Sequence, residues 1–267
     1  MKKLFLSAIA VLLTATLWSQ DIKLEWKPVA KGVEYCTVNQ EFMGLTRFIS
    51  AVRFKTCRHP LQILSSPCEN ADSTSALAAK AGAVAAMNGS YFIVATTDNG
   101  TYFRQDGKKI APTPASECFR VDGVLALKGK KIIIEVCDTT GYDALPYKDI
   151  IAAGPVLLKG GKPVRDSWPR GKFFDRHHPR SLVGVDSKGR GYLIVIDGRF
   201  PRQGEGATLD ETVAIAQQFG LKDAINFDGG GSSTLWVEGP GVLNHPYDNR
   251  RFDNYGQRVV PNILYIK

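Results

Sequence analysis

Two acidic residues each follow an apolar segment and precede a glycine-containing loop. Asp197 ends the apolar run 192–197 and Asp228 ends the run 224–228, with a helical pattern over 209–219 between them. A right-handed strand-helix-strand unit makes its two strands parallel in one sheet, so both carboxylates would emerge at the same sheet edge. The strand backbones would be about 5 Å apart if adjacent and roughly 10 Å apart across one intervening strand. A single Asp at a strand end more often caps a turn, but the pair favours a shared functional site.

The segment after Asp228 has a composition suited to close approach by a ligand. Gly229, Gly230 and Gly231 are followed by Ser232 and another serine. Successive backbone N–H groups in such a turn can form an anion-binding nest. The spacing matches neither a Walker A loop nor a dinucleotide-binding loop, and a flexible turn is the alternative.

Further polar residues interrupt apolar surroundings elsewhere. Arg180 and Arg199 carry guanidinium groups that match phosphate or carboxylate geometry, although a single arginine is more often a surface charge. Asn88 closes a predicted strand and alternatively satisfies a turn. His177 and His178 are adjacent, but no zinc-binding spacing accompanies them, so the sequence favours a site without an essential metal.

Many short apolar segments and few helical ones predict an α+β fold with mixed β-sheets and a few packed helices. One right-handed strand-helix-strand unit is expected in it, and the chain forms one domain or two subdomains around a cleft. The strand candidates cover residues 33–38, 47–55, 61–65, 84–87, 119–121, 124–127, 131–136, 150–153, 181–186, 192–197, 224–228 and 259–266.

Local residues specify a hairpin and the limits of the second helix. A turn is expected over 186–190, where Gly189 supplies a positive φ. Helices are predicted over 73–81 and 209–219. The second has Thr208 as N-cap, Glu211 completing a capping box and a terminal glycine. Glu211 is therefore interpreted as a cap and not as a catalytic acid.

The N-terminus predicts export. Lys2 and Lys3 precede an apolar run that ends near Ser19, which is too short for a membrane span and is typical of a signal peptide over 1–20. The expected mature domain covers 21–267, lies in the periplasm or outside the cell, and has no stable membrane insertion. Removal of Lys2 and Lys3 lowers the formal net charge from +8 to +6, without a long basic run, so nucleic acid is not the expected partner.

Five cysteines lie in the expected mature chain, namely Cys36, Cys57, Cys68, Cys118 and Cys137. An oxidising compartment permits disulfides, and the odd number leaves at least one thiol unpaired. Several of these cysteines fall in predicted strands, where they are also common as small buried residues.

Several segments together resemble the phosphodiester glycosidase family: AAMNGSYF, AAGPVLLKGGK, HPRSLVGVDSKGRGYLIVIDGR, GATLDETVAIAQQFGLKDAINFDGGGSST and RVVPNILYI. The resemblance extends from about residue 33 to the C-terminus. It implies a site that gathers Asn88, Gly89, Gly154, Arg180, Asp197, Arg199, Asp228, Gly229, Gly230, Gly231, Ser232 and Asn244. Ser90 and Tyr91 depart from the family's usual small-then-aromatic pattern and are expected to reshape one pocket wall.

The resemblance implies hydrolysis of a GlcNAc-like glycosyl phosphodiester, with no cofactor, in glycan or exopolysaccharide metabolism. The leaving phosphate monoester needs charge stabilisation more than a proton, which assigns Arg180, Arg199 and the glycine amides to it. Asp228 is expected to act at the anomeric carbon, Asp197 to position water or sugar hydroxyls, and Asn88 and Asn244 to orient the substrate. A non-catalytic glycan-binding or envelope-assembly protein and a phosphate-independent glycosidase are the alternatives.

Overall fold

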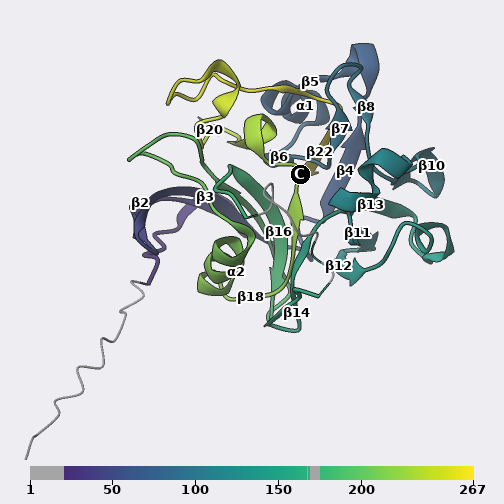
Figure 1. Ribbon diagram of the computed structural model, residues 1–267, viewed down its shortest axis with the longest axis horizontal. Helices are drawn as coiled ribbons and strands as arrows, with labels where there is room; N and C mark the ends of the chain where they lie inside the picture. Colours follow the sequence, from purple (N-terminus) through teal and green to yellow (C-terminus); the bar gives the residue numbers. More distant parts are fainter. Residues whose placement is uncertain (1–20, 167, 169–174) are drawn as a thin grey trace, which may run out of the picture.

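The computed structural model describes residues 21–166, 168 and 175–267 (Figure 1). The predicted signal peptide lies outside these residues. The largest sheet has eight strands in the order β1-β2-β3-β17-β16-β18-β14-β15. Their bounds are β1 Lys27–Ala30, β2 Val33–Phe42, β3 Leu45–Lys55, β14 Val156–Lys159, β15 Lys162–Pro163, β16 Arg180–Asp186, β17 Arg190–Ile196 and β18 Leu221–Phe227.

Two five-stranded sheets have the orders β10-β9-β13-β11-β12 and β20-β19-β6-β22-β4. The first contains β9 Phe103–Gln105, β10 Lys108–Ala111, β11 Gly123–Lys128, β12 Lys131–Val136 and β13 Asp149–Ala153. The second contains β4 Leu61–Ser65, β6 Ala85–Asn88, β19 Leu235–Val237, β20 Gly241–Val242 and β22 Asn262–Ile266.

Helices are few, and the remaining strands form two short pairs. The pairs are β5 Asp72–Ser73 with β21 Val259–Val260, and β7 Phe92–Ile93 with β8 Asp98–Asn99. The α-helices are α1 Thr74–Ala81 and α2 Leu209–Gln218. Short 3₁₀ turns are η1 Cys68–Asn70, η2 Ala115–Arg120, η3 Tyr142–Ala144, η4 Gly230–Ser232 and η5 Tyr247–Asn249. The α+β class with several sheets and few helices is confirmed.

The eight-stranded sheet is buried on both faces because its strands alternate apolar side chains between two cores. In β17, Leu193 and Val195 join the core that also contains strands of the two five-stranded sheets. Tyr192, Ile194 and Ile196 face the opposite core, which is completed by α2. This division follows from the two-residue side-chain period of a strand.

Two strands of the large sheet, β17 and β18, run in the same direction although they are not neighbours. The strand between them, β16, pairs antiparallel with both, and α2 connects the two along the chain. All hydrogen-bonded strand pairs in the described residues are antiparallel. The parallel direction that is expected in a mixed sheet therefore occurs only between strands that are not neighbours, such as β17 and β18. The intervening strand places the backbones of β17 and β18 about 10 Å apart.

The predicted local signals for α2 and the hairpin are confirmed. The Thr208 side chain accepts from the Glu211 N–H, and Glu211 accepts from the Thr208 N–H, which forms the capping box. The hairpin joins β16 to β17, where the Asp186 carboxylate accepts from the Arg190 N–H at 2.9 Å.

None of the described helices is long and apolar enough to cross a membrane. All five cysteines have free thiols.

Candidate functional site

A cavity of about 210 Å³ opens at the end of β18, where Asp228 follows the strand. Its walls come from segments far apart in the sequence. The lining residues are Tyr91, Phe92, Val94, Arg120, His178, Pro179, Arg180, Arg199, Asn226, Asp228, Gly229, Gly230, Gly231 and Arg258. The sequence-predicted residues that the structure brings together here are therefore Arg180, Arg199, Asp228 and the three glycines.

Asp228 is held in position through its backbone. Asn88 Nδ2 donates to the Asp228 carbonyl oxygen at 2.6 Å, and the Asp228 N–H donates to the Gly89 carbonyl at 3.3 Å. Burial raises the pKa of the Asp228 carboxyl to about 6, and this effect is opposed by Ser232, by Arg258 and Arg120, and by the Gly229 N–H. The carboxylate is thus a poised acid–base or nucleophilic group, mostly ionised at neutral pH.

Arg180 is a buried cation in the cavity wall, with only 4% of its surface exposed. Its Nε donates to the Ala207 carbonyl at 2.9 Å and its Nη2 donates to the Arg176 carbonyl at 3.2 Å. Burial lowers its pKa to about 10, which still leaves the guanidinium charged at neutral pH. Such a group attracts an anion into the cavity, where the low local dielectric strengthens the interaction.

Arg199 has a strained backbone that directs it over the glycine turn. Its φ of 69° lies in the left-handed region, which is uncommon for a residue with a side chain. Its Cζ lies 5.1 Å from the centre of the Tyr247 ring, and its Nη2 is 3.2 Å from where a Cβ on Gly230 would stand. Gly230 itself has a φ of 65°, so glycine is favoured there for both conformation and space.

The glycine turn uses several of its amides within the protein. The Gly230 N–H donates to the Pro179 carbonyl at 3.0 Å and the Ser232 N–H donates to the Gly229 carbonyl at 3.2 Å. The Gly229 N–H donates a hydrogen bond to the Asp228 carboxylate. The Gly229 and Gly230 amides, two of the three that were predicted to hold phosphate, therefore already have acceptors within the protein, and the positive charge in the cavity comes from arginine side chains.

Two further arginines, Arg120 and Arg258, were not selected from the sequence. Arg120 is the last residue of η2 and forms an ion pair with Glu117 at 3.1 Å, while Arg258 Nε donates to Asp248 at 2.8 Å. Both lower the pKa of Asp228 electrostatically. Arg258 begins one of the segments that resemble the phosphodiester glycosidase family, which was its only sequence signal. Arg120 has none, because its loop reaches the cavity only through tertiary packing.

Tyr91, Asn226 and His178 complete the walls. The Tyr91 hydroxyl donates to the Gly154 carbonyl at 2.7 Å, and Asn226 Nδ2 donates to the same carbonyl at 3.0 Å. Tyr91 therefore lines the cavity, whereas Ser90 is not one of its lining residues. Burial, followed by the charges of nearby arginines, lowers the pKa of His178 to about 4, so its imidazole is neutral at pH 7.

Asp197 does not line this cavity, contrary to its predicted role in positioning water or sugar hydroxyls. Its carboxylate is 1% exposed and accepts from His245 Nδ1 at 2.8 Å, the His245 N–H at 3.0 Å and Asn244 Nδ2 at 3.1 Å. Asn244 is also fully buried and accepts from the Leu235 N–H at 2.8 Å. The loop after β20, which carries Asn244 and His245, therefore covers Asp197. Asp197 and Asn244 link segments of backbone instead of contacting a ligand.

The other predicted residues also act from behind the cavity. Asn88 is fully buried, and its Oδ1 accepts from the Ser181 hydroxyl at 2.9 Å. A Cβ on Gly89 would collide with Asn262, and one on Gly154 would lie 2.8 Å from the Asp122 carboxylate. These glycines allow close packing. Ser232 is buried beside Asp228 and lowers its pKa.

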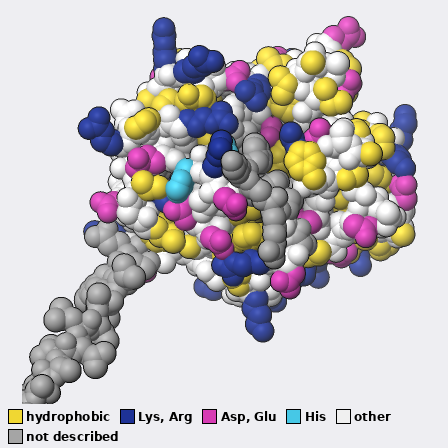
Figure 2. Space-filling view, viewed as in Figure 1, with side chains coloured by type: hydrophobic (Ala, Val, Ile, Leu, Met, Phe, Trp, Pro, Cys, Tyr) yellow, Lys and Arg dark blue, Asp and Glu magenta, His cyan; other side chains and the backbone are white. Residues whose placement is uncertain are grey.

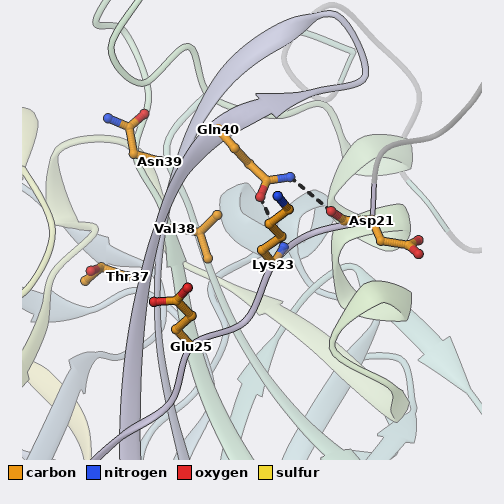
Figure 3. A pocket seen from close by; sticks show the side chains of 7 residues that line it. All are labelled: Asp21, Lys23, Glu25, Thr37, Val38, Asn39 and Gln40. Atoms are coloured by element: carbon orange, nitrogen blue, oxygen red, sulfur yellow. Dashed lines mark hydrogen bonds between the residues drawn. The ribbon is translucent and has the colours of Figure 1, made fainter.

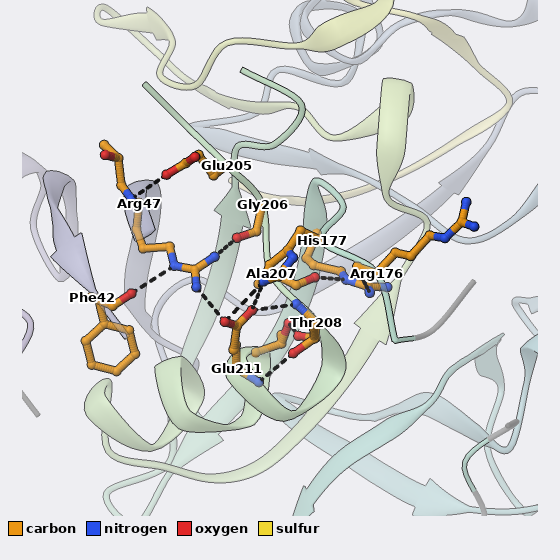
Figure 4. Close-up of polar contacts among 12 residues, drawn as sticks. Phe42, Arg47, Arg176, His177, Glu205, Gly206, Ala207, Thr208 and Glu211 are labelled. Carbon is orange, nitrogen blue, oxygen red and sulfur yellow. Dashed lines mark hydrogen bonds and ion pairs between the residues drawn. The ribbon is translucent and has the colours of Figure 1, made fainter. Parts of the chain in front are cut away.

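A buried polar cluster around Arg47 supports the Arg180 side of the cavity (Figure 4). Arg47 forms an ion pair with Glu211 at 2.7 Å and donates to the carbonyls of Phe42 and Gly206. Glu211 also contacts His177 Nε2 at 3.0 Å. The cluster fixes the chain before α2, including the Ala207 carbonyl that accepts from Arg180.

No group of three or more potential metal ligands occurs among the described residues.

A second hollow, of about 600 Å³, lies beside the first described residues and is unlike this cavity (Figure 3). Gln40 accepts from the Lys23 N–H at 3.1 Å and donates to the Asp21 carbonyl at 3.3 Å. These contacts hold the N-terminal segment against β2. Its described lining contains no arginine or histidine, whereas four arginines line the cavity at Asp228.

Solved structures share the fold. The catalytic domain of zebrafish N-acetylglucosamine-1-phosphodiester α-N-acetylglucosaminidase, auto-inhibited by its pro-peptide, matches with a TM-score of 0.68 and 18% identity, covering 90% of this chain and 84% of that one. A hypothetical protein from Synechocystis matches with a TM-score of 0.68 and 13% identity, covering 91% of this chain and 63% of that one.

The sequence comparisons identify the family. An uncharacterised SPβ prophage-derived protein of Bacillus subtilis, YomE, is 29% identical over 133 residues, which are 49% of this chain and 20% of that protein. The chain thus spans a small part of this curated relative's length. The family model described as phosphodiester glycosidase matches residues 81–267, a range that includes the whole lining of the cavity. This chain belongs to the phosphodiester glycosidase family.

Proposed function

We propose that this protein hydrolyses a glycosyl phosphodiester with a GlcNAc-like sugar, releasing the sugar and a phosphomonoester. One observation carries the proposal: a carboxylate with a raised pKa, Asp228, shares a small cavity with four arginines. Family membership supports a hydrolase of this type. The sugar and its place in glycan or exopolysaccharide metabolism are part of the proposal.

The arginines suit the leaving group. When the bond between the anomeric carbon and the phosphate oxygen breaks, its electron pair goes to the phosphate, which departs as a monoester. The developing charge is stabilised by cations that are already in place and need no reorganisation. Arg180 is the best placed for this role because its backbone partners fix its guanidinium. Arg199 adds a second planar fork above the glycine turn.

Asp228 serves the other half of the reaction. Its ionised carboxylate attacks the anomeric carbon or removes a proton from the attacking water, and either route passes through an oxocarbenium-like state. The neutral imidazole of His178 faces the same cavity and accepts or donates one hydrogen bond with a sugar hydroxyl. Asn88, Asp197 and Asn244 act through the backbone segments that they hold.

The test uses two substrates that share one sugar. A methyl diester of N-acetylglucosamine 1-phosphate and a phosphate-free nitrophenyl N-acetylglucosaminide are incubated with the protein, and released sugar is measured. Release from the diester alone supports the proposal. Release from both indicates a phosphate-independent glycosidase. Binding of the diester without release indicates a glycan-binding protein, and either result overturns the proposed reaction.

Export to the periplasm or the medium is a further part of the proposal. Its support is the basic-then-apolar pattern of the first twenty residues. N-terminal sequencing of protein from its native host is expected to begin near Gln20 or Asp21. An intact N-terminus starting at Met1 would contradict export.

A further inference from the structure

A third concave surface lies at the other end of the large sheet, away from the catalytic cavity. This groove, of about 670 Å³, is formed by the end of β3, the β16–β17 turn and the beginnings of β12 and β18. Its lining residues are Lys55, Thr56, Cys57, Lys131, Ile132, Ile133, Val185, Asp186, Ser187, Lys188, Gly189, Arg190, Lys222 and Asp223. We refer to it as the basic groove.

The distance between the two sites follows from β18. Lys222 stands at the start of this strand and Asp228 follows its end, so six residues separate them. At about 3.3 Å per residue, the groove and the catalytic cavity are roughly 20 Å apart. A single sugar diester in the cavity cannot reach the groove, but a polymer of several sugar units can.

The positive charges in the basic groove are largely uncompensated. Lys55, Lys131, Lys188 and Lys222 are exposed, and none forms a salt bridge within residues 21–166, 168 and 175–267. Figure 2 shows Lys and Arg side chains along the lower edge of the molecule, below the β18 label of Figure 1.

The two carboxylates of the groove are already engaged by other groups. Asp186 pairs with Arg190 at 2.6 Å, and Asp223 accepts from the Gly160 N–H at 2.7 Å and lies 3.7 Å from Lys159. Neither therefore cancels the lysine charges. Lys55 and Arg190 act on the charge of Glu34, but Lys131, Lys188 and Lys222 line the groove without a salt-bridge partner in the described residues, and such a group of cations favours an anionic ligand.

We propose that the basic groove binds an anionic segment of a polysaccharide, at a site distinct from the catalytic cavity. The lysines attract phosphate or carboxylate groups of the polymer, while the hydroxyls of Thr56 and Ser187 in the lining hydrogen-bond sugar hydroxyls. The identification of the polymer as a glycan rests on the proposed function. The groove then increases the local concentration of polymeric substrate without taking part in bond cleavage.

A nucleic acid is the less favoured polyanion because the groove lacks a stacking surface. None of its lining residues is aromatic, whereas single-stranded nucleic acids are bound through bases stacked on aromatic side chains. The lysines also form a compact group and not a long basic stripe.

The experiment compares two charge-reversed double variants on immobilised phosphomannan, a polysaccharide that carries phosphodiesters. Lys131→Glu with Lys222→Glu changes the groove. Lys27→Glu with Lys108→Glu makes the same change in net charge at exposed lysines elsewhere. Lys131 faces Lys128 across the β11–β12 hairpin, so glutamate there creates an opposite-charge pair and is tolerated by the fold. Circular dichroism checks both variants, and the corresponding Lys→Gln pair replaces the first if it is unfolded.

The groove variant is expected to bind phosphomannan about tenfold more weakly and with a shallower salt dependence than the wild type. The control variant is expected to stay near wild-type affinity, and neutral mannan to bind weakly to all three. The proposal is overturned if both variants lose affinity equally, or if neutral mannan binds as well as phosphomannan. Tighter, groove-dependent binding of single-stranded DNA overturns the glycan assignment.

Hydrolysis of the small methyl diester separates this proposal from the proposed function. The groove variant is expected to keep wild-type kcat/KM on it, since the mutated lysines are roughly 20 Å from Asp228. A wild-type protein that binds phosphomannan through the groove but does not cleave the diester would refute the proposed reaction and leave the groove assignment standing.

Discussion

Asp228 and Asp197 follow two strands of one sheet that run in the same direction, yet their surroundings differ in kind. Asp228 faces a cavity with four arginines, whereas the Asp197 carboxylate accepts hydrogen bonds from His245 and Asn244 and is closed off from that cavity. The covering loop after β20 makes this difference. A carboxylate at a strand end is therefore a functional candidate only if the loops of other strands leave it accessible.

Replacing Asp228 by asparagine is expected to have the largest effect. The amide cannot act as nucleophile or base, and a positioned acid or base typically contributes about 10²–10⁴-fold to turnover. Steady-state kinetics on the methyl diester should show this loss in kcat, and calorimetry should show that the diester still binds. Near-normal turnover in the variant would remove Asp228 from the reaction.

Arg199→Lys is expected to have the next largest effect. Lysine keeps the charge but loses the planar fork, so we expect kcat/KM on the diester to fall about 10–100-fold, the equivalent of a charge-assisted hydrogen bond. Release from a phosphate-free aryl glycoside, if measurable, should change little. Equal damage to both substrates would show that Arg199 serves the sugar or the fold and not the phosphate.

Asp197→Asn sharpens the comparison because its effect should appear in stability more than in chemistry. In the wild type the His245 backbone N–H donates to the Asp197 carboxylate, whereas in the variant it would face the asparagine NH₂ group, which cannot accept. An unsatisfied buried group of this kind costs about 1–3 kcal/mol. We expect a lower melting temperature, while kcat on the diester, measured well below that temperature, falls less than about tenfold. A loss in kcat comparable to that of Asp228→Asn, with the melting temperature unchanged, would exchange the roles of the two acids.

The smallest expected effect is a pH-dependent gain in stability on changing Asp228. Because burial raises its folded-state pKa to about 6, the folded state loses stability as the pH rises from the unfolded-state pKa to about 6, and the full cost remains at higher pH. Below the unfolded-state pKa both states are protonated and the cost is absent. Asp228→Asn should therefore melt higher than the wild type at pH 7.5, and the difference should narrow towards pH 3.5. The kcat/KM of the wild type should also fall as the pH decreases through about 6, because kcat/KM reports the ionisation of the free enzyme. If Asp228→Asn retains measurable activity and that activity still falls below about pH 6, the pH dependence belongs to another group.

Sequence by itself determined the features that depend on a few neighbouring residues. The capping box of Thr208 and Glu211 sets the start of α2, and the alternation in β17 assigns its side chains to two cores. The acid-glycine segment after β18, singled out from its residues alone, lines the cavity. These features are local because their hydrogen bonds or side-chain directions are set within one or two turns of chain.

Only the tertiary structure decided which residues share the cavity. Arg120 and Arg258 reach Asp228 from loops more than a hundred residues apart, and the covering of Asp197 by His245 depends on the path of a distant loop. The lysines of the basic groove likewise converge from separate strands. Residues from these distant segments come together because whole sheets pack against one another, and no local pattern of residue types predicts which of them will meet.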